Sequence, residues 1–357
     1  MNRRQFRMKH LNRWVYAVVG VCVLLFAGLI YAWSVFSVPI ESEFSTWSKA
    51  QLSMTFTVAM IFFCLGGLLG GALVGTAKIS VKINVVASGI LFLAGFWLTA
   101  RTQATWQLYT GFGVMIGLAS GLAYNAVMGT MSKWFLDRRG LISGILFMGF
   151  GLSSLLMGKI FQIYTAAAPD AWRVSFKSLG ALLFVLIAGS SVFFENAPED
   201  VIEAGKSAAR ERENTGLPPE RILRHSSFWH AYCWSILAGA GGLVLVSQAS
   251  GVVMEVKPLT ESGVVTLVGL ISVFNGVGRV VFGLLYDAKG YRFTMALDVL
   301  LLLVAAGSLF GAIIIGRFFL VPLGFILGGL AFGGVPTCVS ALTGDFYGMQ
   351  YCSFARI

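Results

Sequence analysis

The chain has 357 residues, of which 57% are hydrophobic and only 12% are charged, and its mean hydropathy is +0.80. A soluble domain carries about a quarter charged residues, so this composition excludes a water-soluble globule and indicates a membrane protein. At about 20 apolar residues per span, the length allows roughly ten to twelve transmembrane helices.

Long apolar runs separated by short polar breaks predict ten transmembrane helices. In chain order they cover residues 14–37, 50–75, 83–101, 106–132, 141–164, 173–194, 228–251, 262–285, 292–316 and 318–343. The longest polar stretch, residues 195–227, is mixed in charge and contains three prolines, so we expect a cytoplasmic linker there. The chain then divides into an N-terminal six-helix bundle (1–194), the linker, and a C-terminal bundle of four helices (228–357).

The basic residues predict the orientation of these helices. Most of the 26 lysines and arginines fall on one side of the membrane when the N-terminus is placed in the cytoplasm, as the positive-inside rule requires. The net charge of +10 is therefore explained by topology in an inner (plasma) membrane. It does not indicate a nucleic-acid partner.

The sequence contains no recognisable catalytic, metal-binding or phosphate-binding motif. The five cysteines are widely spaced, and the three histidines lie near predicted helix ends, so neither a disulfide framework nor a metal motif is present. The sequence also contains no P-loop and no nucleophile elbow. We therefore expect no cofactor, no metal site and no enzymatic activity.

An internal repeat relates the two parts of the chain. GLASG at 117–121 recurs as GLAFG at 329–333, and the same offset in residue number also takes Gly66 to Gly278 and Gly71 to Gly283. Six spans return a chain to the same side, so the repeat predicts two tandem six-helix units in parallel orientation. The second unit would extend about two helices beyond Ile357. We therefore expect a truncation, either natural or through a partial sequence or a shifted reading frame.

Four segments of the sequence resemble one family of transporters. They are YAWSVFSVP (31–39), GLASGLAYNAVMGTMSKWFLDRRGLISGILFMGFG (117–151), FNGVGRVVFGLLYDAKG (274–290) and GLAFGGVPTCVSALTGDFYG (329–348). They resemble, in the same order, transporters of the major facilitator superfamily, in particular the oxalate:formate antiporter family. The resemblance implies an all-α membrane protein built from two parallel six-helix repeats, the second incomplete. It also implies transport of a small organic anion by alternating access.

The resemblance extends to loops that gate such transporters. Four residues, Gly283, Asp287, Gly290 and Arg292, match the superfamily's loop motif. In that motif the glycine permits close helix approach, while the aspartate caps a helix start and pairs with basic residues across the gate. Arg138 and Arg139 match the inner loop between the fourth and fifth helices, where they either serve the gate or only anchor the loop by the positive-inside rule.

Arg279 is the most informative single residue, because it lies deep in the eighth predicted span. A cation in hydrocarbon is costly unless it faces a cavity or a partner. A guanidinium binds a carboxylate through two parallel hydrogen bonds, so an organic anion is the expected ligand. A structural pair with Asp298 or with a backbone carbonyl is the alternative interpretation.

The resemblance adds further residues to this site. In the family, aromatic residues on the first, fourth and tenth helices surround the anion, and Tyr31, Tyr124 and Phe332 match them, the last without a hydroxyl. Asn275, one turn before Arg279, could add a donor. The family's second cation lies on an eleventh helix that is not part of this sequence. We therefore expect a monocarboxylate such as formate, pyruvate or lactate to fit better than oxalate.

The sequence leaves two alternatives open. One is a transporter of the same fold for a sugar or a drug, which would not need Arg279, and the other is a truncated membrane protein that does not transport. Transport could be coupled to an antiported anion or to a proton. The expected partners are a small organic anion and the lipid bilayer, with the protein itself a monomer.

Overall fold

The computed structural model describes residues 12–75, 79–165, 171–195, 197–198, 202, 224–257 and 261–347. Over these ranges the regular structure is helical, with no strand. Most of the predicted linker, residues 195–227, and the last ten residues of the chain lie outside the described part.

The described residues of the first half supply six helical segments long and apolar enough to cross a membrane. The first segment is nearly continuous but changes from α to 3-10 geometry and back in its middle. The first segment consists of α1 (Arg13–Ala27), η1 (Gly28–Ala32) and α2 (Trp33–Glu43), and the second and third are α3 (Lys49–Gly75) and α4 (Val81–Thr99). The fourth consists of α5 (Thr105–Leu108), the π-helical η2 (Tyr109–Ile116) and α6 (Gly117–Trp134). The fifth is α7 (Arg139–Thr165), and the sixth is α8 (Ala171–Ser190) with η3 (Ser191–Phe193).

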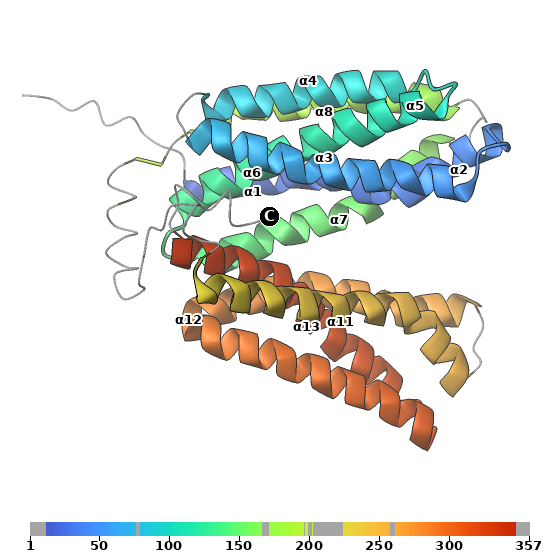
Figure 1. The fold of residues 1–357 in the computed structure, drawn as a ribbon, viewed down its shortest axis with the longest axis vertical. Helices are drawn as coiled ribbons and strands as arrows, with labels where there is room; N and C mark the ends of the chain where they lie inside the picture. The colour runs from blue at the N-terminus through green and yellow to red at the C-terminus, as the bar shows by residue number, and fades with distance from the viewer. Residues whose placement is uncertain are drawn as a thin grey trace, which may run out of the picture.

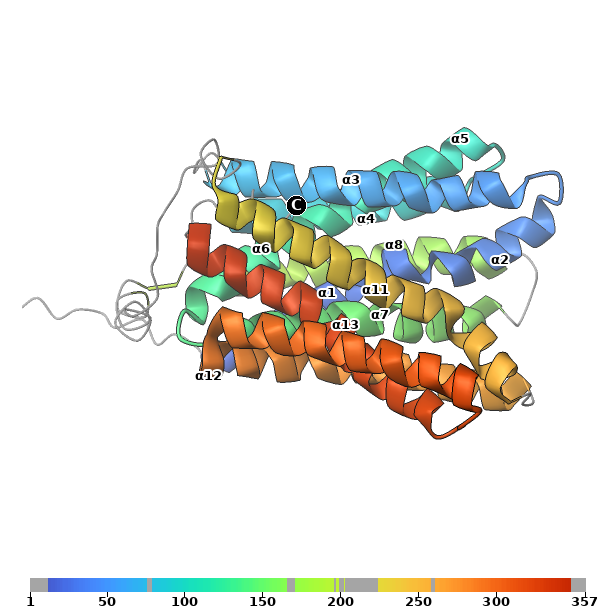
Figure 2. The ribbon, with the colours of Figure 1, turned by 60° about the horizontal axis from the view of Figure 1, so that its bottom comes forward.

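The second half contains α11 (Ser226–Val256), α12 (Glu261–Ile315) and α13 (Leu320–Tyr347). At 55 residues, α12 is too long for one span, and it is interrupted at Gly290, where φ is 78° and ψ is 175°. A positive φ is easily adopted only by glycine, so this residue lets the chain reverse. Both parts of α12 run beside α13 (Figure 2). The nine membrane-length segments of the described chain therefore account for the ten predicted spans, because α12 supplies two.

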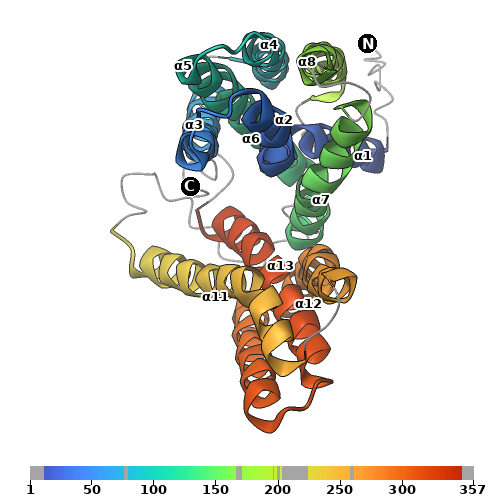
Figure 3. The same cartoon turned by 90° about the vertical axis from the view of Figure 1, so that its right-hand side faces the viewer.

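The helices form two groups, with α7 between them (Figures 1 and 3). One large apolar cluster, which includes Phe36, Phe112 and Phe176, fills the interior of the first group. The second group has two smaller clusters, and much of its apolar surface faces outward, as at Leu303 and Ile314. Such surface is stable in contact with lipid rather than water.

Close helix contacts repeat with the offset in residue number that the sequence repeat predicts. A side chain on Gly66 would meet the carbonyl of Leu118, and one on Gly278 would meet the carbonyl of Leu330. Both partners of the first contact thus recur, at the repeat-related positions, in the second. The same relation joins the contacts of Gly117 with Ala59 and Gly329 with Ile271, and of Gly121 with Phe63 and Gly333 with Asn275.

Substitution of a contact glycine tests this packing. Gly121→Ala would force a methyl group into the carbonyl of Phe63 and should destabilise the protein by about 1–3 kcal/mol, the usual cost of overpacking. The measurement is the melting temperature of the purified protein in detergent, where we expect a fall of several degrees.

Gly129→Ala is the matched control on the same helix, because nothing lies within 4 Å of a side chain added there. It should leave the melting temperature unchanged or raise it slightly, since alanine favours a helix over glycine. Equal loss of stability in both variants would contradict the close contact at Gly121.

Candidate functional site

The two halves of the chain meet along one face of α7. In Figures 1 and 3, α7 lies between the helices of the first half and the pair α12 and α13. We call this line of contacts the seam. Its α7 residues recur at helical spacing, so they lie on one side of the helix: Arg139, Gly140, Ser143, Gly144, Phe147 and Gly151.

A buried ion pair closes the end of the seam at which α7 begins. We call this the outer end, because it is the end farther from the middle of the molecule. Arg139 Nη1 donates to Asp345 Oδ1 and to the carbonyl of Gly344, both at 2.8 Å. The hydroxyl of Tyr286 donates to the second oxygen of Asp345 at 2.9 Å. The two charged side chains are only 9% and 11% exposed. Such a pair is costly to break, because removing one partner leaves a buried charge uncompensated.

The carboxylate of Asp287 caps the first turn of α7. Its two oxygens accept the backbone N–H groups of Gly140 at 2.9 Å and Leu141 at 2.8 Å. These N–H groups have no partner within their own helix, and the N-terminus of a helix favours negative charge. Because Asp287 belongs to α12, the cap is lost when the two helices separate.

Glycine lets the backbones of α7 and α12 touch. A side chain on Gly283 would meet the carbonyl of Gly140, and one on Gly144 would meet the carbonyl of Arg279. Small residues are the usual means of bringing membrane helices this close. The seam therefore requires glycines at these close contacts as well as the polar side chains that pair across it.

Arg279 forms the inner end of the seam. Its Nε donates to the side-chain oxygen of Asn275 at 3.1 Å, and its Nη1 donates to the carbonyl of Phe147 on α7. The guanidinium lies against Gly151, where a Cβ would stand 2.5 Å from Nη1. The cation of the second half is thus held by the backbone of the first.

The alternative pairing of Arg279 with Asp298 is not formed. Asp298 is fully buried, and neither carboxylate oxygen has a hydrogen-bond partner among the described residues. Its Oδ1 instead faces Gly334 of α13, where a Cβ would lie 2.7 Å away. Of the two structural partners considered for Arg279, the structure contains the carbonyl and not the acid.

Tyr31 and Tyr124 pack against the same turn of α7 that Arg279 contacts. The ring of Phe150 lies 5.5 Å from the ring of Tyr31 and 5.7 Å from that of Tyr124. The next residue along α7 is Gly151, against which the guanidinium packs. Tyr31 and Arg279 are also close enough to interact electrostatically. Three predicted site residues, which come from η1, α6 and α12, therefore reach the same turn of α7.

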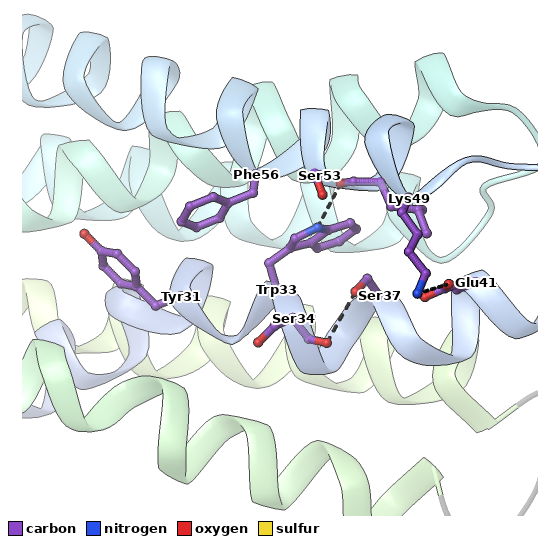
Figure 4. Close-up of a pocket in the computed structure, with 9 residues that line it drawn as sticks. Tyr31, Trp33, Ser34, Ser37, Glu41, Lys49, Ser53 and Phe56 are labelled. Carbon is purple, nitrogen blue, oxygen red and sulfur yellow. Dashed lines mark hydrogen bonds and ion pairs between the residues drawn. The ribbon is translucent and has the colours of Figure 1, made fainter. Parts of the chain in front are cut away.

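A pocket of about 380 Å³ leads away from Tyr31, between the first span and α3 (Figure 4). Tyr31 stands at one end, and at the other Glu41 and Lys49 form an exposed ion pair at 3.9 Å. Serine hydroxyls and aromatic rings line the space between these ends. The lining residues are Tyr31, Trp33, Ser34, Ser37, Glu41, Lys49, Leu52, Ser53 and Phe56.

The pocket and the outer seam lie toward opposite ends of the first span. Arg13, at the start of α1, forms an ion pair of 2.7 Å with Asp137, two residues before α7 begins. The start of the first span therefore lies beside the outer end of the seam. Glu41, near the far end of the same span, marks the other end of the molecule.

Three predicted gating residues stay close to their own loops. Gly290 provides the reversal within α12. Arg292 donates to the hydroxyl of the neighbouring Tyr291 at 3.0 Å, and Arg138 lies 3.8 Å from the adjacent Asp137. Of the predicted gating set, Gly283, Asp287 and Arg139 are the residues that the structure brings to the seam. A gating role for all six stays a prediction.

Phe332 is not brought to the convergence around Phe150. Its ring packs across Gly242 of α11, so closely that a side chain at that glycine would overlap the ring. The predicted contact between Phe332 and an anion stays a prediction.

Sequence reasoning missed Asp345 and Tyr286. Asp345 lies just beyond the last predicted span and Arg139 just before the fifth, so opposite charges at the same side of the membrane were a usable signal. Tyr286 precedes Asp287 within the loop motif and carried no signal of its own.

These features define a class of protein: a polytopic helical membrane protein of two bundles. The seam joins the bundles at one end, and the pocket beside Tyr31 lies toward the other end. The profile of the Major Facilitator Superfamily matches residues 11–354. The chain therefore belongs to this superfamily of membrane transporters.

Relatives of known sequence agree with the expected resemblance. The chain is 25% identical over 340 residues to the uncharacterized MFS-type transporter YhjX of Escherichia coli K12, covering 95% of this chain and 82% of that protein. It is 27% identical over 293 residues to the oxalate:formate antiporter of Oxalobacter formigenes, covering 80% and 66%. It is 26% identical over 266 residues to monocarboxylate transporter 13 of Bos taurus, covering 73% and 58%.

Solved structures confirm the expected fold. The proton:xylose symporter XylE bound to 6-bromo-6-deoxy-D-glucose has a TM-score of 0.63 at 15% identity, covering 97% of this chain and 86% of that chain. A double-tryptophan variant of XylE has a TM-score of 0.66 at 14% identity, covering 96% and 85%. At these identities the likeness concerns the fold alone.

A cysteine pair tests the seam. In a chain whose five native cysteines are replaced by alanine, Ser143→Cys with Ser340→Cys should form a disulfide, because the two hydroxyls lie 3.3 Å apart. A protease site inserted into residues 195–227 allows a readout in non-reducing gels, where the disulfide keeps the cleaved halves together. Ser143→Cys with Gly239→Cys, on α11, is the control pair. Equal cross-linking by both pairs would contradict the seam.

Proposed function

We propose that this protein is a secondary active transporter that carries a small organic anion across the inner membrane by alternating access. The proposal rests on one observation: Arg279 converges with Tyr31 and Tyr124 between the two halves of the chain. Formate, pyruvate and oxalate are the substrates considered. A monocarboxylate suits the site best, because one guanidinium neutralises one carboxylate.

In this proposal the N-terminus, and the end of the seam at which α7 begins, face the cytoplasm. The positive-inside bias of the sequence supports this, as do the basic residues at that end, which include Arg13, Lys82, Arg138 and Arg139. The described conformation is then closed toward the cytoplasm, and the pocket that ends at Tyr31 opens toward the outside.

Binding of an anion would compete directly with the seam. A carboxylate accepts a hydrogen bond from a guanidinium more strongly than a backbone carbonyl does, so an anion that reaches Arg279 displaces the carbonyl of Phe147. The inner contact between α12 and α7 is then lost. A ligand shifts a conformational equilibrium by its difference in affinity for the two states, and this exchange of partners supplies such a difference.

The tyrosines would orient the anion while Arg279 binds its charge. Their rings already pack against Phe150, so their positions are fixed before a ligand arrives, and their hydroxyls can donate to a carboxylate. Asn275, which accepts from Arg279 Nε, fixes the direction of the guanidinium. Both sides of the proposed site belong to one chain.

The names of two relatives support an anionic substrate, since both the oxalate:formate antiporter and monocarboxylate transporter 13 are named for carboxylates. The likeness to XylE concerns the fold and does not identify a sugar as the substrate. The choice between the two substrate classes therefore depends on transport measurements.

Uptake into proteoliposomes tests the proposed function. Purified protein should take up labelled formate, pyruvate or oxalate, each inhibited by the other carboxylates and not by xylose. Liposomes without protein provide the background. Uptake of xylose without uptake of any carboxylate would reject an anion transporter in favour of a sugar transporter.

Substitution of Arg279 tests the binding site. Arg279→Gln should lower carboxylate uptake about 10- to 100-fold, because a hydrogen bond to a charged group contributes about 1.5–3 kcal/mol. Arg279→Lys keeps the charge without the planar fork, so its carboxylate uptake should lie between that of the unsubstituted protein and that of Arg279→Gln. Arg317→Gln removes an exposed arginine of the same half and should have no effect. Full uptake by Arg279→Gln at normal expression would remove Arg279 from the site.

A further inference from the structure

The pocket beside Tyr31 has polar side chains that the site around Arg279 does not use. On the first span, Ser34, Ser37 and Glu41 follow Tyr31 at intervals of three or four residues and line the pocket, so they lie on one side of the helix. Polar residues within a membrane span normally face the protein interior or a water-filled cavity rather than lipid. This row of polar groups therefore indicates a hydrated path that ends at Tyr31.

Helix α3 forms the facing wall of the pocket. Lys49 and Ser53, one helical turn apart on α3, lie across from the polar row of the first span (Figure 4). The indole N–H of Trp33 donates to the backbone carbonyl of Leu52 at 2.9 Å. This buried hydrogen bond joins the two walls, so the pocket is already formed before a ligand arrives.

The size of the pocket exceeds what a passage for one small anion needs. Its volume is about 380 Å³, within the range of about 300–1,000 Å³ that is usual for sites that bind organic molecules. A water molecule occupies about 30 Å³ in the liquid, so the pocket can hold a small carboxylate together with part of its hydration shell. An anion can therefore stay in this space while Arg279 is still bound to α7.

The positive charge of the pocket is only weakly engaged. Lys49 Nζ lies 3.9 Å from Glu41 Oε1, and the two side chains are 88% and 43% exposed. An exposed pair of this kind contributes little to stability. By contrast, Glu43 accepts from Arg173 at 2.6 Å and from the indole of Trp172 at 2.8 Å. Glu43 and Arg173 are thus held by each other, whereas Lys49 can exchange its partner for another carboxylate.

We infer that this pocket is a second, external binding site for the transported anion, in which Lys49 binds the carboxylate in place of Glu41 before the anion reaches Arg279. The inference rests on the proposed function. The ammonium group donates hydrogen bonds to the carboxylate, and the hydroxyls of Ser34 and Ser53 can donate as well. Glu41 competes with the anion for Lys49, so it weakens the external site and favours release of the anion toward Tyr31.

Substitutions of the two charged residues should have opposite effects on the KM for uptake. Lys49→Gln should raise the KM for labelled pyruvate about three- to fivefold, the upper range of an exposed ion pair, with little change in maximal rate because Arg279 is untouched. Glu41→Gln should lower the KM, because the competing carboxylate is gone. The measurement is initial uptake by right-side-out vesicles at low ionic strength, and added salt should reduce both effects.

Lys177→Gln is the matched control, because it removes an exposed lysine of the same half, on α8, that does not line the pocket. Its KM should equal that of the unsubstituted protein. An unchanged KM in Lys49→Gln would show that Lys49 only anchors its helix at the membrane surface, and it would overturn the external site. A raised KM in Glu41→Gln would contradict the competition for Lys49.

Restoring the charge chemically separates an electrostatic role of Lys49 from a structural one. In a chain whose five native cysteines are replaced by alanine, Lys49→Cys can be labelled from outside with membrane-impermeant thiosulfonate reagents. A cationic label should return the KM for pyruvate toward that of the cysteine-free chain with Lys49 intact, and an anionic label should raise it further. Excess pyruvate should slow the labelling, because it occupies the pocket.

The same labels on Lys177→Cys should leave the KM unchanged. Equal KM values after cationic and anionic labelling of Lys49→Cys would overturn the external site, even where uptake itself is normal. Absence of carboxylate uptake in the unsubstituted protein would instead reject the proposed function, and the external site with it. The two failures are therefore distinguishable.

Discussion

The position of Arg279 sets the constraint on which the rest of the site depends. A guanidinium within a membrane span needs an acceptor, and the structure supplies it from the opposite half of the chain, at the carbonyl of Phe147. That choice requires the two backbones to be in contact, which in turn requires glycine at 144 and 151. The guanidinium therefore keeps this carbonyl as its acceptor only while the seam is closed. A stronger acceptor bound to Arg279 would replace a contact that keeps the halves together.

The two halves share a scaffold but not a site. The glycine contacts between the second and fourth spans recur at the repeat-related positions between the eighth and tenth, so the packing of each half is built in the same way. The differences lie along one line: Gly67 corresponds to Arg279, and Gly75 to Asp287. The first half therefore keeps small residues where the second half carries the charged groups of the seam. This asymmetry makes α7 of the first half the partner of both charged side chains: it offers a carbonyl acceptor to Arg279 and backbone N–H donors to Asp287.

The fold followed from the sequence, because hydropathy and helix length are local properties that survive packing. The offset of the repeat also recurs among the glycine contacts, since a glycine that lets helices touch in one half has the same use in the other. The site was predicted only in part. Arg279 was chosen because a charge in a span is visible in the sequence, and Tyr31 and Tyr124 because they match aromatic positions of the resembled family; a binding role for all three stays a prediction. A backbone carbonyl was one of the alternatives for Arg279, but the carbonyl of Phe147 could not be singled out, because a backbone carbonyl carries no side-chain signal. Asp345 and Arg139 lie 206 residues apart in the sequence, and only their opposite charges at the same side of the membrane connect them before the structure is known.

The balance of forces in the molecule favours motion between halves over motion within the first half. A large cluster of buried aromatic and aliphatic side chains holds the first half together. The seam has instead a few polar contacts on bare backbone, each with a net contribution of about 0.5–3 kcal/mol. Moving a two-state equilibrium from one side to the other takes about 5.5 kcal/mol, which is the sum of only a few such contacts. In the proposed function, loss of the Phe147 contact to an anion therefore weakens the seam while the aromatic core of the first half stays intact.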